Sequence, residues 1–214
     1  MQRIRRKVVW GSRAALAVLL SSFMFGGCGK AVRQGQGAAD LVLEQIVAAS
    51  GVRPDEFDHV LASDVVTFVD AGDAGRVPTI FEDPGRAQFR VVMKDIGIPS
   101  SPTTPTTNNW ITITRWHVTY TRADGRNTQG VDVPWAFDGT GTQIVTAGST
   151  QMIFTLVRAS AKGEAPLQAL IGAGGADYIA TLAEVTFYGH DNAGNAVSAT
   201  GRISVNFADW GDPQ

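Results

Sequence analysis

Residues 110–122 read WITITRWHVTYTR, and this stretch decides the fold class. Large apolar side chains alternate with polar ones along it, as they do in a strand that buries one face. The alternation shifts by one residue partway along. The apolar positions are Ile111 and Ile113 before the shift, and Trp116, Val118 and Tyr120 after it. Because a one-residue step turns every side chain to the other face, we predict a β-bulge near Thr114-Arg115; the alternative is a strand partly buried on both faces.

Other parts of the chain show the same two-residue period between segments rich in Gly, Asp and Asn. We predict further strands at residues 61–69, 88–94, 151–157, 184–188 and 202–207. Turn sequences separate them: DAGDAG at 70–75, DPG at 83–85, DGRN at 124–127, DGTG at 138–141 and DNAGN at 191–195. Gly supplies positive φ in such turns, and Asp and Asn bond to their own backbone. Short strands divided in this way predict an all-β fold, an antiparallel sandwich or barrel.

The composition excludes several other classes of protein. The 214 residues include 24 Gly, only 18% are charged, and the mean hydropathy is near zero. These values argue against a coiled coil, a disordered acidic tail and a membrane protein with several spans. The length suits one domain, or one domain plus a tail.

Residues 1–27 read as an export signal rather than as part of the fold. Five basic and no acidic residues lie within positions 1–13, and residues 14–25 (AALAVLLSSFMF) carry no charge. A helix of that length rises about 18 Å, too short for the roughly 30 Å hydrocarbon core of a bilayer. A basic start before a short apolar segment is typical of a secretory signal peptide. Arg5-Arg6 also fits a twin-arginine signal, so the export route stays open.

Cys28 follows the apolar segment directly after Phe25-Gly26-Gly27. This arrangement resembles the lipobox of bacterial lipoproteins, which implies that Cys28 receives diacylglycerol and becomes the new N-terminus. As the only cysteine, it cannot form an internal disulfide in an exported chain, and lipidation accounts for it. The alternatives are an incidental cysteine beside an ordinary cleavage site, or an uncleaved anchor. Gly29 differs from the Asp of inner-membrane retention signals, so in a diderm host we expect the outer membrane.

Cleavage before Cys28 would also change the charge of the chain. The mature protein would carry 13 basic and 20 acidic residues, a balance of −7. This disfavours nucleic acid and anionic lipid headgroups as partners, because both need a basic face. We expect attachment to the membrane through acyl chains instead, since two or three chains hold a protein firmly.

Residues 28–55 are expected to form the lipidated cysteine and a tether. GKAVRQGQG at 29–37 reads as a flexible spacer, and residues 38–50 as a short helix, although their apolar side chains form no clean stripe. The β-sandwich domain is then expected at 56–214. Within it we predict an exposed Pro/Thr-rich loop at 100–109 and one helical turn at 165–175.

The sequence HDNAGN at 190–195 lies between two alternating strands. It resembles the last hairpin of bacterial immunoglobulin-like domains, in which a D-x-x-G-N turn often joins the final two strands. The resemblance covers the 25 residues from Ala183 to Phe207, and extends back to about Val60 only through the strand pattern. It implies an immunoglobulin-like sandwich. An antibody-type core is excluded, since the chain has no Cys–Trp–Cys pattern.

The sequence shows no catalytic or metal-binding motif. Its histidines, His59, His117 and His190, have no His or Cys partner at metal-ligand spacing. G-x-S-x-G, H-E-x-x-H and Walker motifs are missing, and the Gly-rich residues 172–175 have no adjacent Lys-Ser/Thr. The acidic residues that could supply a catalytic pair are scattered: Asp132, Asp138, Glu164, Asp177 and Glu184.

Two other kinds of ligand, Ca²⁺ and a sugar, are considered. Asp191, Asn192 and Asn195 offer oxygens for Ca²⁺, but a turn accounts for them without a metal. Four tryptophans could form an aromatic sugar-binding face: Trp110, Trp116, Trp135 and Trp210. We expect Trp116 in the core, because it shares the parity of the other apolar residues of its strand, and Trp135 and Trp210 at the edge.

The sequence therefore predicts a cell-envelope lipoprotein, lipidated at Cys28, rather than an enzyme. We expect no cofactor and no metal, and a structural, adhesive or assembly role for the sandwich. The expected partners are the membrane, through acyl chains, and envelope proteins or glycans, but not nucleic acid. The alternative is an envelope carbohydrate-binding module or glycan hydrolase with a site built from loops.

Overall fold

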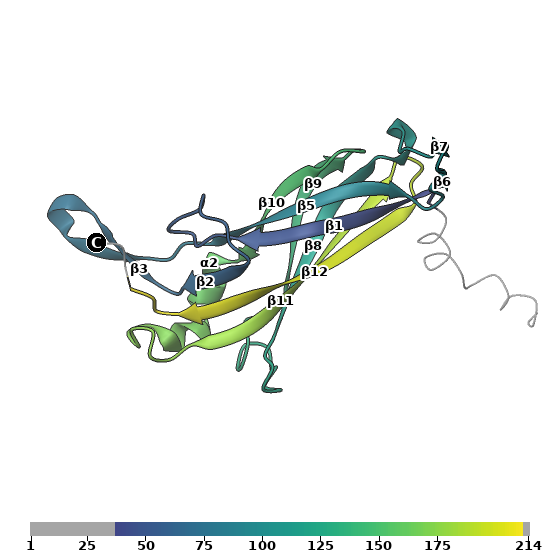
Figure 1. The fold of residues 1–214 in the computed structure, drawn as a ribbon. Coiled ribbons are helices and arrows are strands. Elements are labelled where there is room, and N and C mark those ends of the chain that lie inside the picture. The colour runs from purple at the N-terminus through teal and green to yellow at the C-terminus, as the bar shows by residue number, and fades with distance from the viewer. Residues whose placement is uncertain (1–36, 212–214) are drawn as a thin grey trace, which may run out of the picture. The chain divides into compact units, whose positions relative to one another are not determined.

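Two β-sheets pack face to face in the computed structural model, which describes residues 37–211 (Figure 1). The three-stranded sheet has the order β1-β5-β10, formed by Ala39–Ala48, Asp83–Met93 and Thr150–Val157. The five-stranded sheet has the order β2-β12-β11-β8-β9, formed by Val60–Asp64, Ala196–Ala208, Ile179–Asp191, Ile111–Thr121 and Phe137–Val145. Neighbouring strands are antiparallel except β2 and β12, which are parallel. The predicted all-β, largely antiparallel sandwich is confirmed.

The remaining elements are short and lie in the connections. Two small hairpins are formed by β3 (Thr67–Asp70) with β4 (Arg76–Thr79), and by β6 (Gly97–Ile98) with β7 (Ser101–Pro102). The helical elements are α2 (Ala159–Lys162) and the 3₁₀ turns η1 (Gly72–Ala74), η2 (Thr107–Asn109) and η3 (Leu167–Leu170). The η3 turn confirms the helical turn predicted within 165–175, and residues 100–109 are largely exposed as predicted. Among residues 37–211, no helix is long and apolar enough to cross a bilayer.

The change of phase in β8 arises from a bulge at Thr114, as predicted. In the pairing with β11, Arg115 lies opposite Tyr188 and Ile113 lies opposite Gly189. Thr114 therefore has no partner on β11. The register with β9 shifts at the same place. Ile113 before the bulge and Trp116 after it are therefore both buried.

Residues 38–50, which we read as a possible short helix, contain strand β1 (Ala39–Ala48) instead. The strand pairs with β5 and has its own register shift between Leu43 and Gln45. Leu41 before the shift and Ile46 after it are both buried, so the apolar positions follow neither a helical nor a simple strand period. The sandwich consequently begins at β1, and not at residue 56.

Two of the predicted turns are strand segments in which glycine makes room for an aromatic ring. Residues 138–141 lie within β9, where a Cβ on Gly139 would come 2.1 Å from the Trp116 ring. Residues 83–85 begin β5, where a Cβ on Gly85 would come 2.5 Å from the Phe154 ring. Glycine inside a strand often marks such a close approach. The Trp116 and Phe154 rings themselves meet edge to face at 6.0 Å.

The predicted final hairpin is confirmed. β11 and β12 pair without interruption from Ile179–Phe207 to His190–Ala196. In the turn, the Asp191 carboxylate accepts hydrogen bonds from the backbone N–H of Ala193 (3.0 Å) and of Asn195 (2.8 Å) and from the Asn195 side chain (2.8 Å). Gly194 adopts a φ of +84°, which glycine tolerates best.

We predict that Gly139→Ala destabilises the sandwich, because the new methyl group would overlap the Trp116 ring. Overpacking of a core typically costs about 1–3 kcal/mol. Urea unfolding of the wild type and the variant would measure the loss. Gly148→Ala is the matched control, since a Cβ there meets nothing within 4 Å and we expect no loss. Equal losses for both variants would contradict the explanation.

Candidate functional site

A buried ion pair is the strongest polar feature of the core. Lys162 Nζ lies 2.8 Å from Asp83 Oδ1, and the two side chains are 1% and 0% exposed. The same carboxylate accepts hydrogen bonds from Ser63 Oγ at 2.6 Å and from the Gly51 backbone N–H at 2.8 Å. Both carboxylate oxygens therefore accept hydrogen bonds. Such bonds offset the cost of removing the charge from water.

Four segments that are distant in sequence meet at this carboxylate. Asp83 begins β5 of the three-stranded sheet, Ser63 lies in β2 of the five-stranded sheet, and Lys162 ends α2. Gly51 belongs to the segment between β1 and β2. The pair thus ties both sheets to the α2 crossing, which fixes one end of the sandwich.

The chemistry of this cluster is structural. Serine, lysine and aspartate together could in principle activate a nucleophile, but Ser63, Asp83 and Lys162 are buried from any substrate. Burial raises the pKa of the Asp83 carboxyl, and the Lys162 ammonium opposes that rise. Burial also raises the pKa of the Tyr120 hydroxyl, and the negative charge of Asp83 raises it further.

We predict that Lys162→Met strongly destabilises the protein, because it leaves the Asp83 carboxylate buried without its counter-charge. Removing one partner of a buried pair costs about 3–5 kcal/mol. The free energy of unfolding from urea titration measures the effect. Lys94→Met is the control: Lys94 pairs with Asp40 at the surface, at 3.6 Å, where an ion pair contributes about 1 kcal/mol or less. A similar small loss for both variants would show that the buried pair does not hold the sandwich.

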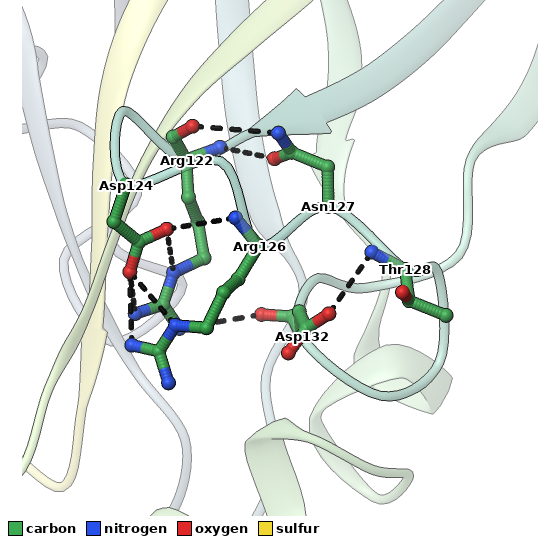
Figure 2. A network of polar contacts seen from close by, with 6 residues as sticks. All are labelled: Arg122, Asp124, Arg126, Asn127, Thr128 and Asp132. Carbon is green, nitrogen blue, oxygen red and sulfur yellow. Dashed lines mark hydrogen bonds and ion pairs between the residues drawn. The ribbon is translucent and has the colours of Figure 1, made fainter.

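A second polar network lies on the surface, in the loop that joins β8 to β9 (Figure 2). Arg122 holds Asp124 with two hydrogen bonds, at 2.7 and 3.2 Å. Arg126 adds two side-chain bonds, at 2.8 and 3.0 Å, and its backbone N–H a third at 3.1 Å. These hydrogen bonds, from Arg122 first and then Arg126, hold the pKa of the Asp124 carboxyl well below its usual range.

Further bonds hold the rest of this loop in place. The Arg122 backbone N–H donates to Asn127 Oδ1 at 2.7 Å, and the Thr128 N–H donates to Asp132 Oδ2 at 3.1 Å. The Arg122 side chain is only 14% exposed although its loop is at the surface. The loop therefore holds these polar groups in a network of mutual hydrogen bonds.

An open cavity of about 390 Å³ lies beside this network. Its lining comprises Arg122, Ala123, Asp124, Tyr178 and Ala180. Tyr178 is 60% exposed and lies just before β11. A solvent-exposed aromatic ring next to a rigid guanidinium–carboxylate pair is an arrangement that can bind a polar ring-shaped molecule.

The histidines singled out in the sequence have different surroundings. His117 Nδ1 lies 3.2 Å from Asp138 Oδ1 on the outer face of the five-stranded sheet, where Arg115 NH1 contacts the same oxygen at 3.3 Å. His59 lies 3.4 Å from the Gln45 side chain. His190 is exposed beside the last turn.

The carboxylates considered as a catalytic pair have separate local roles. Asp132 bonds within its loop, Asp138 contacts the two side chains named above, and Glu184 pairs with Arg202 at 2.7 Å. Glu164 and Asp177 are exposed in the segment between β10 and β11. Within residues 37–211, no group of three or more His, Cys, Asp or Glu side chains gathers where it could hold a metal ion.

The other residues considered for binding are placed as follows. Asp191 is 5% exposed and directs its carboxylate into the turn, while the Asn192 side chain donates to the Thr107 carbonyl at 2.6 Å. Trp116 lies in the core, as predicted, and its indole N–H donates to the Thr155 carbonyl at 3.2 Å. The other tryptophans differ: Trp135 is 52% exposed, whereas Trp110 and Trp210 are half-buried. Cys28 and the predicted signal peptide lie outside the described residues.

Comparison with known proteins adds little to this description. No family model matches the chain, and no curated protein does. Among solved structures, the sporulation control protein Spo0M from Bacillus subtilis is similar over 79% of this chain, at 14% identity and a TM-score of 0.25. This chain spans about half of that protein, 49%. A likeness this weak carries no argument about fold or function.

Proposed function

We propose that this protein is an exported lipoprotein of the cell envelope, acylated at Cys28, whose sandwich has a non-catalytic structural, adhesive or assembly role. The observation that carries the proposal is the single cysteine placed directly after a basic and then apolar leader. The anchor would be acyl chains, and its expected location is the outer membrane of a diderm host. The proposal includes an immunoglobulin-like character for the sandwich, which rests on the resemblance of the hairpin at 183–207.

The arrangement of the polar side chains supports a non-catalytic role. The charges of Asp83 and Lys162 are paired with each other, and both side chains are buried. The surface groups of the β8–β9 loop are bonded mainly to one another. Catalysis by paired acids or by an activated nucleophile needs groups that a substrate can reach.

We predict that Cys28→Ser abolishes lipid labelling and membrane retention, because a serine offers no sulfur for the thioether to diacylglycerol. Labelling of growing cells with a radioactive or clickable fatty acid, followed by fractionation, measures both. Gly29→Ser is the matched control, since it adds the same side chain one residue later and leaves the sulfur intact. Lipid label on the Cys28→Ser variant, or its absence from the wild type, would contradict the proposal.

Carbohydrate binding is a second candidate, favoured by the cavity beside Tyr178. An aromatic ring offers an apolar face to the C–H groups of a sugar, and the hydrogen-bonded Arg122–Asp124 pair places polar groups beside it. The ligand would be an envelope glycan, and binding would need no catalytic group.

Under this second candidate we predict that Tyr178→Ala lowers the affinity for soluble cell-wall glycan fragments at least tenfold, because it removes the exposed ring. Calorimetric titration of the full chain measures the affinity. Tyr188→Ala is the control: the Tyr188 ring packs under the Arg115 guanidinium, 4.1 Å from its centroid, away from the cavity residues. Lack of binding by the wild type, or equal affinities, would rule out this site.

A further inference from the structure

The described chain enters the sandwich at one end of the two sheets. Ala39 pairs with Met93, the last residue of β5, and the Lys94 backbone N–H donates to the Ala38 carbonyl at 3.0 Å. We call this the entry end. Its other connections are residues 94–110, 146–149 and 192–195, and Figure 1 shows β6 and β7 there. The opposite end carries the β3–β4 hairpin and the β8–β9 loop.

The two ends differ sharply in charge. Residues 96–110, 146–149 and 192–195 contain no Asp, Glu, Lys or Arg. The charged groups that border them are engaged: Lys94 pairs with Asp40, Asp95 accepts the Gly97 N–H at 2.9 Å, and Asp191 is turned inward. Every connection of the opposite end contains charged residues, four each in 49–59, 65–82, 122–136 and 158–178.

Two isoleucines project from the uncharged stretch 96–110 of the entry end. Ile96 is 76% exposed and Ile98 is 62% exposed, and no other two large apolar side chains within residues 37–211 are so exposed and so close in sequence. The β6–β7 hairpin holds them: Ile98 pairs with Ser101, and the Thr103 N–H donates to the Ile96 carbonyl at 3.1 Å. Gly97 between them has a φ of +70°, so the two side chains are presented by a defined turn.

The distance to the expected anchor is short. Cys28 precedes Gly37 by nine residues, and nine residues span at most about 30 Å when fully extended. An acyl chain at Cys28 would therefore keep the entry end within that distance of the bilayer. Exposed apolar side chains next to uncharged loops mark a surface that can contact lipid. The charges of Asp40, Lys94 and Asp95 lie at the border of this surface.

We propose that the entry end rests on the bilayer, with Ile96 and Ile98 inserted among the lipid headgroups and acyl chains. The inference rests on the acylation proposed above. The acyl chains supply most of the attachment, and the two isoleucines set the orientation of the sandwich. The acidic mature chain would be repelled by an anionic bilayer, and this orientation turns its charged connections away from the membrane.

The test measures the depth of single spin labels on the full chain in its membrane. Acylation occupies the sulfur of Cys28, so an introduced cysteine is the one free thiol. For Ile98→Cys carrying a nitroxide, we expect collision with oxygen, which concentrates in lipid, to exceed collision with a water-soluble nickel chelate severalfold. For Ala74→Cys in η1, at the opposite end, we expect the reverse. Equal aqueous exposure of both labels would overturn the proposal.

A second substitution tests the role of the neighbouring isoleucine. In the Ile98→Cys background, Ile96→Asn should shift the label at least twofold toward the nickel chelate. Ile153→Asn, at a 67% exposed position on β10, should leave it unchanged. Equal effects of the two substitutions would overturn the proposal.

Mass spectrometry of the N-terminal peptide from the same membranes tests the acylation of Cys28 separately from the orientation of the sandwich. Acylated Cys28 with an aqueous label at residue 98 would refute the orientation alone. An unmodified Cys28 would refute the lipoprotein proposal, and the orientation with it.

Discussion

A buried ammonium and a buried carboxylate are in direct contact at one end of the sandwich, and this contact joins both sheets to the α2 crossing. Lys162 and Asp83 are 79 residues apart in sequence and 2.8 Å apart in space. A buried ion pair adds little to stability compared with apolar residues of the same size. It requires the two charged groups to lie in one well-defined geometry. Because Ser63 and Gly51 bond to the same carboxylate, a misplacement of any of the four segments would leave a charge or a donor unsatisfied.

The two-residue pattern of the sequence predicted strands well where buried and exposed residues alternate without interruption. The hairpin of β11 and β12 was predicted from residues 183–207, although both strands are longer than the predicted 184–188 and 202–207. The bulge at Thr114 was also predictable, because enough apolar residues lie on each side of it to show both phases. In β1 the bulge divides the strand into two pieces too short to show a period, so the segment resembled a poor helix. Glycines 85 and 139 suggested turns, because the rings that need their space lie in other strands.

The polar sites were less predictable than the strands. Asp83 stands in a sequence typical of a turn, and Lys162 in one typical of an exposed helix end, so their partnership depends on the tertiary fold. Arg122, Asp124 and Arg126 lie within five residues, and their alternation with small residues was the available signal; it indicated a turn but not the cavity beside Tyr178. Cys28 differs from these residues, because an export signal is read from the linear sequence itself.

The Trp116 ring of β8 occupies the space that a side chain at position 139 of the neighbouring strand β9 would fill. Gly139 has no side chain because the indole fills that position, and Gly141 lies next to it with its own Cβ position 3.2 Å from the ring. These positions therefore form one steric unit, although they lie on neighbouring strands. Over evolutionary time, a bulkier residue at 139 could be accepted only together with a smaller one at 116. Covariation between these columns would consequently be the trace that this packing leaves in descendants of the same ancestor.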